Sequence, residues 1–265
     1  TGATLQLLTT RPSNNPWVSL AATVDNEGEF TLAGTFETSP CGQAGGLPAV
    51  SNSGVLTVAG ANARILRTSP GNLHSFYPSF DNEAGGIIQG DGTLTFEDDS
   101  LADNRDEYRV MKFNNAGTIS PGASTGSLET AGMDVLFQSG GELVIEIGGV
   151  NPGDYDTFTV SSFTDGVDYD SPKGGILDLS GSGDNLRIEL VNDYVPQLGE
   201  SWDILTADTV LGDFDTIVFP ARIDGGWQGS TFRLNGVPEP ASVILLMAGL
   251  LPCIRRRARR SHRAE

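Results

Sequence analysis

Residues 142–147 read Glu-Leu-Val-Ile-Glu-Ile, and an apolar side chain stands at every second position of this run. Leu143, Ile145 and Ile147 form one face, and the alternate positions are Glu142, Val144 and Glu146. Alternation with period two predicts a β-strand with one buried face. Glycine pairs border the run on both sides, and glycine is typical of the turns that end strands.

The same short pattern recurs outward from this run in both directions. Further segments that predict strands are Gly54–Val58, Thr93–Phe96, Asp156–Val160, Gly175–Leu179, Leu186–Val191, Trp202–Thr206 and Thr231–Leu234. No stretch of the body keeps a helical period for three turns, and the charged segment Asp98–Lys112 is expected to be a loop with at most one helical turn. The body is therefore predicted to be all-β.

Two architectures fit a series of short strands. One is a parallel β-solenoid, in which successive coils stack, and the other is a β-sandwich. The chain has 34 glycines, and Asn and Asp are frequent beside them. Tight corners that need positive φ favour the solenoid, although the connectors show no fixed period. The aromatic residues within strand-like runs are expected to lie in the core; they are Trp17, Phe158, Trp202, Phe214 and Trp227.

The chain carries a net charge of −18, and its basic residues are unevenly placed. Residues 1–240 contain 10 Lys and Arg against 33 Asp and Glu, a net charge of −23. Such a body repels phosphate backbones, so no nucleic-acid partner is expected. The chain has only two Cys (Cys41 and Cys253) and two His (His74 and His262), which do not cluster as zinc ligands or as a catalytic set.

The composition changes sharply at Gly236. A Pro-rich element, residues 237–242, precedes the apolar run Val243–Leu251, and an arginine cluster begins at Arg255, after three intervening residues. A helix over 241–254 would be about 21 Å long, which is short of the ~30 Å hydrocarbon core. Arginine snorkelling and local thinning of the bilayer can cover part of the difference. The arginines are expected on the cytoplasmic side, with residues 1–236 exported.

This order of Pro-Glu-Pro, apolar run and arginine cluster resembles the PEP-CTERM sorting signal of Gram-negative bacteria. The resemblance implies recognition of the motif by an exosortase, a membrane transpeptidase, with anchoring in the inner membrane before processing and a cell-surface or extracellular location afterwards. It also implies association with exopolysaccharide and biofilm. The residues concerned are Val237, Pro238, Glu239 and Pro240 for recognition; Val243, Ile244, Leu245, Leu246, Met247, Ala248, Gly249, Leu250 and Leu251 for the membrane; and Arg255, Arg256, Arg257, Arg259 and Arg260 for the cytoplasmic stop, within an Arg-rich tail 255–263.

A second resemblance covers about residues 85–235. Segments such as Gly86–Leu94, Asn115–Gly122 and Gly140–Gly148 look like passenger repeats of autotransporter β-helices. The resemblance implies a right-handed parallel β-helix. It divides the chain into a β-rich part, 1–84, which is expected to continue the same solenoid, the autotransporter-like part, 85–235, and the sorting signal, 236–265.

Motifs that would indicate catalysis are weak. Gly122–Gly126 matches G-x-S-x-G, but that nucleophile elbow needs a helix after the serine and none is predicted there. Carboxylate pairs are frequent, as expected by chance in so acidic a body. We therefore expect a structural protein and not an enzyme. A carbohydrate-binding adhesin and a polysaccharide-degrading enzyme on a β-helix remain the alternatives.

No cofactor is expected, and calcium is the one metal considered. Asp165, Asp168 and Asp170 lie in one loop and carry the oxygen ligands that Ca²⁺ prefers, but their spacing is not that of an EF-hand. Ice binding would need a regular ladder of threonines on successive coils. Thr93-Leu94-Thr95 and Thr157-Phe158-Thr159 appear as isolated pairs in the sequence, which argues against such a ladder.

Overall fold

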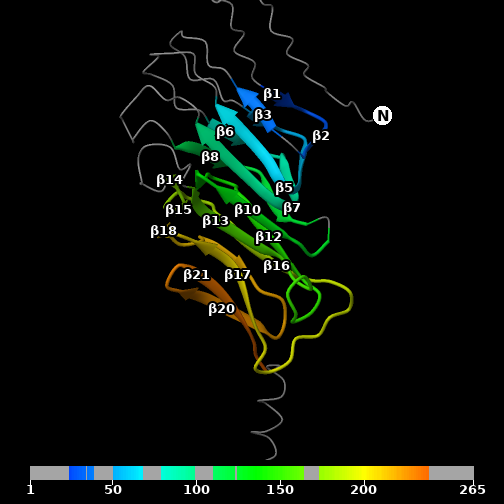
Figure 1. Cartoon of the computed structure of the whole chain (residues 1–265). Helices are drawn as coiled ribbons and strands as arrows, with labels where there is room; N and C mark the ends of the chain where they lie inside the picture. The colour runs from blue at the N-terminus through cyan, green and yellow to red at the C-terminus, as the bar shows by residue number, and fades with distance from the viewer. Residues whose placement is uncertain are drawn as a thin grey trace, which may run out of the picture.

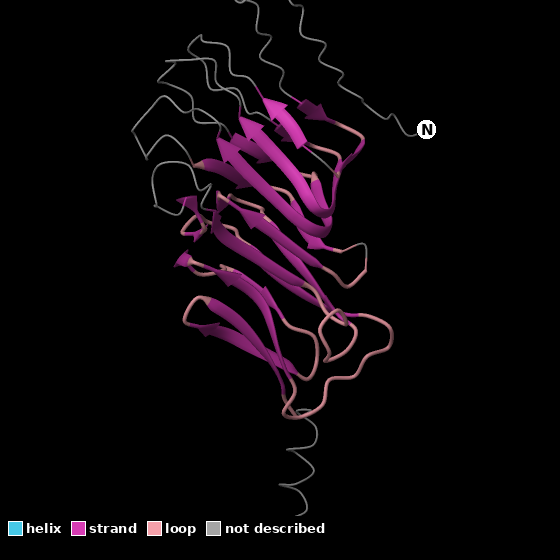
Figure 2. Cartoon of the chain, viewed as in Figure 1, coloured by secondary structure: helices cyan, strands magenta, loops and turns pink. Residues whose placement is uncertain are grey.

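The fold is all-β, as the strand pattern predicts. The computed structural model describes residues 24–33, 35–38, 50–67, 79–98, 110–122, 124–163 and 173–238. These residues form 21 strands, and the described part of the chain contains no helix (Figure 2). The predicted strand Glu142–Ile147 has the observed bounds, and the other seven predicted segments each overlap an observed strand.

Seven strands form one parallel sheet, here called row A (Figure 1). Each strand of row A pairs with the strand of the same row that follows it in the chain. Row A consists of β1 (Val24–Asn26), β4 (Val50–Asn52), β6 (Ser79–Asn82), β8 (Met111–Asn115), β11 (Met133–Phe137), β15 (Ile176–Leu179) and β18 (Thr209–Gly212).

The other strands form a larger sheet whose pairing divides it into two further rows. Row B consists of β2 (Glu29–Leu32), the first parts of β5 (Val55–Arg67) and β7 (Ile87–Asp98), β9 (Thr118–Pro121), β12 (Glu142–Ile147), β16 (Asn185–Leu190) and β19 (Thr216–Val218). Row C consists of β3 (Thr35–Thr38), the second parts of β5 and β7, β10 (Ser127–Ala131), β13 (Thr157–Phe163) and β17 (Ser201–Ala207). The short strand β14 (Lys173–Gly174) pairs with β13 at its edge.

The long strands β5 and β7 each pass from row B into row C, and β7 bends between the two rows at glycines. In β7, Gly90 and Gly92 have φ of 126° and 154°, and β9 pairs before this point whereas β10 pairs after it. A Cβ on Gly92 would also lie 2.2 Å from the carbonyl oxygen of Gly60. Only glycine allows both the backbone conformation and this close approach.

The core lies between the three rows and is formed by alternate side chains. Leu143, Ile145 and Ile147 of β12 are fully buried, as the alternation predicts. The predicted core aromatics Phe158, Trp202 and Phe214 are also buried, whereas Trp227 is half-buried and Trp17 lies outside the described residues. Period-two alternation therefore identifies the buried face of strands such as β8 and β9, whereas β12 also buries Val144 on its other face.

Connector length varies, and this explains why the sequence shows no fixed period. In row A, 22 residues separate the paired positions Met111 and Met133, whereas 42 separate Val135 and Leu177. The predicted loop Asp98–Lys112 overlaps strands at both ends, because Asp98 ends β7 and Met111 begins β8; residues 99–109 lie outside the described part.

A column of buried asparagines joins the first four strands of row A at their carboxyl ends. The amide nitrogen Nδ2 of Asn26 donates to Oδ1 of Asn52 at 2.7 Å, Asn52 donates to Asn82 at 2.8 Å, and Asn82 donates to Asn115 at 2.7 Å. Phe137 is in register with Asn115 on the next strand, so the column ends there and Nδ2 of Asn115 has no hydrogen-bond partner.

The larger sheet ends in an antiparallel hairpin, which interrupts the parallel pairing. The last strand β21 (Thr231–Gly236) pairs antiparallel with β17 on one side and with β20 (Ile223–Gln228) on the other. Trp227 stacks on Phe214 with an interplanar angle of 5° and packs edge-on against Phe232. This aromatic cluster joins the hairpin to the end of the core.

Candidate functional site

The point at which the chain leaves the body is set by the reversed direction of β21. Because β21 runs antiparallel to β17, its last residues lie opposite the start of β17, with Asn235 in register with Ser201. The backbone nitrogen of Gly236 donates to the carbonyl oxygen of Glu200 at 2.9 Å. The backbone nitrogen of Val237 donates to the carbonyl oxygen of Arg222 at 2.8 Å. The exit toward the Pro-Glu-Pro motif is therefore held by backbone hydrogen bonds.

The loop of residues 191–200 packs directly against this exit. A Cβ on Gly236 would lie 2.0 Å from the carbonyl oxygen of Gln197, so the two backbones touch at a position that only glycine allows. The Glu200 carboxylate fixes the loop, because its Oε2 accepts from the Tyr194 hydroxyl at 2.6 Å and from the Gln197 backbone nitrogen at 2.7 Å. In Figure 1 this loop, coloured yellow, lies at the lower end of the body.

A second loop, residues 148–155, is joined to the first through aromatic side chains. Nε1 of the buried Trp202 donates to the carbonyl oxygen of Gly149 at 2.8 Å, and the Trp202 ring packs edge-on against Tyr194 at 6.3 Å. The backbone nitrogen of Val191 donates to the carbonyl oxygen of Ile147. Both loops are thus built onto the same corner of the body.

Of the residues proposed for sorting, the structure describes two. Val237 is half-buried and Pro238 is exposed. Glu239, Pro240, the apolar run Val243–Leu251 and the arginines lie outside the described residues, as do the calcium candidates Asp165, Asp168 and Asp170. In the described ranges no helix is long and apolar enough to cross a membrane, and no group of three or more His, Cys, Asp or Glu is placed to hold a metal ion.

Two aspartates are fully buried, at different corners of the body. Asp156 accepts from the backbone nitrogens of Gly126 at 2.7 Å and of Glu146 at 2.8 Å, and burial raises its pKa to about 7 although both donors oppose the shift. Asp184 has no hydrogen-bond partner at either carboxylate oxygen. Burial, with smaller contributions from Asp215 and Asp178, raises the pKa of Asp184 to about 6. Because both carboxylates are buried from solvent and lie at different places in the body, they do not form a catalytic pair.

Asp184 makes the free energy of unfolding depend on pH. Because its pKa is raised from 3.8 to about 6, the folded protein holds the proton more tightly than the unfolded chain does. The resulting stability is complete below about pH 4 and is lost as the pH rises to about 6, with roughly 1–3 kcal/mol involved. We expect Asp184→Asn and Asp184→Ala both to flatten this slope in urea unfolding at pH 4–8. An unchanged slope in both variants would contradict the assignment to Asp184.

The Gly122–Gly126 motif lies in a turn between two strands. Gly122 has φ of 80° and exchanges backbone hydrogen bonds with Gly90, and β10 begins at Ser127, directly after the motif. A nucleophile elbow requires a helix at this place, so the exposed Ser124 belongs to a structural corner.

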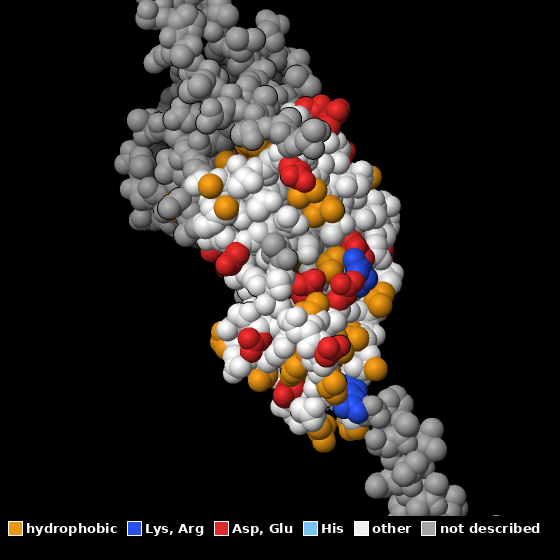
Figure 3. Space-filling model, turned by 90° about the vertical axis from the view of Figure 1, so that its right-hand side faces the viewer, with side chains coloured by type: hydrophobic (Ala, Val, Ile, Leu, Met, Phe, Trp, Pro, Cys, Tyr) orange, Lys and Arg blue, Asp and Glu red, His pale blue; other side chains and the backbone are white. Residues whose placement is uncertain are grey.

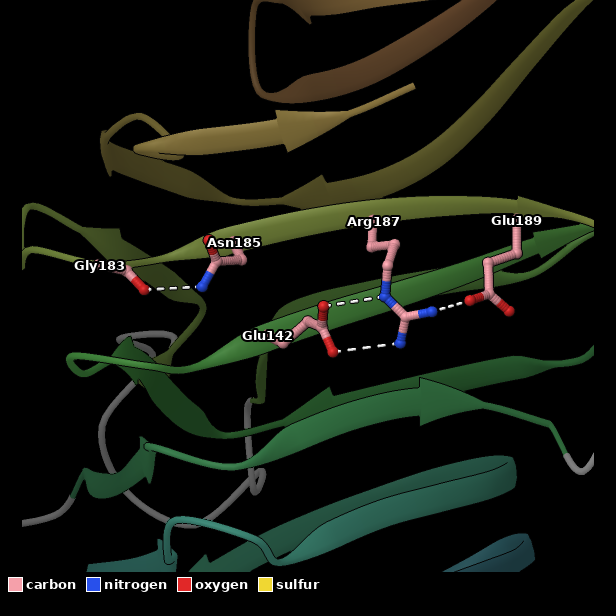
Figure 4. A network of polar contacts seen from close by, with 5 residues as sticks. All are labelled: Glu142, Gly183, Asn185, Arg187 and Glu189. Carbon is pink, nitrogen blue, oxygen red and sulfur yellow. Dashed lines mark hydrogen bonds and ion pairs between the residues drawn. The ribbon is translucent and has the colours of Figure 1, made fainter. Parts of the chain in front are cut away.

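Three basic side chains on the described surface are paired with carboxylates. Arg187 lies between two glutamates on row B: it contacts Glu142 through two hydrogen bonds of 2.9 and 3.2 Å and forms an ion pair with Glu189 (Figure 4). Lys112 contacts Asp134, and Arg233 contacts Asp203 through two bonds. These contacts offset positive charge locally, so the body presents mainly carboxylates to a partner.

The register of row C brings together hydroxyl groups that look isolated in the sequence. Thr93, Glu129, Thr159, Thr206 and Thr231 occupy equivalent positions on successive strands. Thr159 therefore has threonines in register, at positions 206 and 231, that the unequal connectors hide in the sequence, whereas Thr93, Thr95 and Thr157 have no threonine beside them on β10. Glu129 interrupts the row and accepts hydrogen bonds from Thr93 and Ser161, so the row is not an uninterrupted threonine ladder.

Neither the protein-family models nor the curated proteins include a match to this chain.

Proposed function

We propose that this protein is an exported structural component of the bacterial cell surface or extracellular matrix, delivered by exosortase sorting. The body is a three-faced parallel β-solenoid, right-handed as the autotransporter resemblance implies, and rows A, B and C are its faces. In-register parallel pairing along all three rows supports this architecture. Rows of stacked parallel strands are typical of a solenoid and favour it over a β-sandwich.

One observation carries the sorting proposal: the order Pro-Glu-Pro, apolar run and arginine cluster, placed directly after the last strand of the body. Prolines hold an extended backbone that a membrane enzyme can bind. The apolar run supplies the membrane segment, and the arginines retain it with the cytoplasmic side. The acidic body, with its paired cations, suits a soluble extracellular component better than a binder of polyanions.

The proposal is tested by processing in the native host. We expect intact-mass analysis of the recovered body to place its C-terminus at or near Pro238–Pro240. Glu239→Ala, and replacement of the five arginines by glutamine, should each lower the processed fraction at least tenfold. Glu27→Ala, which changes an exposed glutamate of the body, is the matched control and should be processed normally. Normal processing of both tail variants would overturn the proposal.

A further inference from the structure

Exposed apolar side chains gather where the chain leaves the body. Among the described residues, large hydrophobic side chains are exposed at five positions, and three of them lie on the two loops at the exit. We call these three the exit patch: Val150, Val195 and Leu198, which are 43%, 50% and 74% exposed. Figure 3 shows hydrophobic side chains, in orange, at this end of the body. The accumulation of apolar surface at one point of an acidic body requires a physical reason.

The turn that presents Leu198 is firmly built. Glu200 donates its backbone nitrogen to the carbonyl oxygen of Gln197 at 3.2 Å, and Gly199 has φ of 92°, as the third residue of a type II turn requires. Leu198 is the second residue of this turn and points to solvent, while the flanking Gly199 and Glu200 are hydrogen-bonded to Gly236. Leu198 is therefore held in place beside the exit.

The length of chain beyond the exit limits what can face this patch. Val243, the first residue of the apolar run, lies seven positions after Gly236. Fully extended, seven residues span at most about 25 Å. If the run enters a bilayer, the exit and its loops are held within this distance of the lipid surface.

We infer that the exit patch rests on the surface of the membrane into which the chain's own apolar run inserts, so that the body is docked by its lower end before processing. The inference depends on the proposed function. Valine and leucine side chains can enter the boundary between headgroups and acyl chains. Because the turn at Leu198 is already ordered, binding does not carry the entropy cost of ordering a loop. Because the body is acidic, a surface of zwitterionic lipid suits it better than an anionic one.

The full-length chain, reconstituted into phosphatidylcholine vesicles, tests the inference. Cys41 and Cys253 are replaced by serine, and an environment-sensitive fluorophore is attached to Leu198→Cys or to the matched control Leu211→Cys. Leu211 is 44% exposed on row A and is not part of the exit patch. Quenching by lipids that carry a headgroup spin label is expected to be at least twofold stronger at position 198, and weaker in vesicles that contain phosphatidylglycerol.

The outcomes separate this inference from the proposed function. If the chain floats with the vesicles but quenching at position 198 does not exceed that at position 211, the docking inference is overturned while membrane insertion stands. If the chain does not float with the vesicles, membrane insertion itself is overturned, and the docking inference with it. Leu198 is exposed, so its replacement should leave the fold intact, which circular dichroism checks.

Discussion

Replacing Asn82 by alanine is expected to lower the free energy of unfolding by about 3 kcal/mol or more. Asn82 is fully buried; it accepts from Asn52 at 2.8 Å and donates to Asn115 at 2.7 Å. Alanine would leave buried polar atoms on both neighbours without this partner, and each such atom costs about 1–3 kcal/mol. Urea unfolding followed by circular dichroism measures the change.

Asn114→Ala is the matched control for this prediction. Asn114 also donates one hydrogen bond of 2.7 Å, to Asp81, but it is half-buried on the outer side of row A. Water can replace that bond, so the expected loss is below about 1 kcal/mol. Equal losses in the two variants would show that the buried asparagine column contributes no more than a surface hydrogen bond.

Gly54→Ala is expected to destabilise the protein by several kcal/mol, or to prevent folding. A Cβ at this position would lie 2.2 Å from the carbonyl oxygen and 2.7 Å from the nitrogen of Gly28, which stands in the turn stacked against it. Neither backbone atom can move without disturbing the hydrogen bond of 2.7 Å from Val55 to Gly28. Overpacking usually costs about 1–3 kcal/mol where the neighbouring side chains can adjust. Here the neighbouring atoms belong to the backbone of Gly28, so a larger loss is expected.

Gly28→Ala provides the control in the same type of turn. Both glycines follow an asparagine of the column by two residues, but nothing described lies within 4 Å of a Cβ on Gly28. Its replacement is therefore expected to change the free energy of unfolding by less than about 1 kcal/mol. A thermal melt of both variants measures the difference, and similar melting temperatures would refute close stacking of the turns.

Local pattern predicted eight of the 21 described strands and the buried face of several of them. Alternation in Glu142–Ile147 and in Leu186–Val191 indicated which side chains are buried, because the side chains of a strand point to opposite faces in turn. The order of residues after Gly236 likewise suggests the sorting hypothesis, which remains a proposal. These properties depend on neighbours in the sequence and need no knowledge of the fold.

Only the tertiary structure decided which strands pair and what their pairing brings together. The asparagine column, and the in-register threonines Thr159, Thr206 and Thr231, join residues separated by unequal connectors, so no sequence period predicts them. The exit patch likewise depends on the antiparallel direction of β21, which brings Gly236 to the loop at Gln197–Glu200. The physical reason is that alternation determines which face of a strand is buried, whereas hydrogen-bond register between distant segments determines which side chains become neighbours.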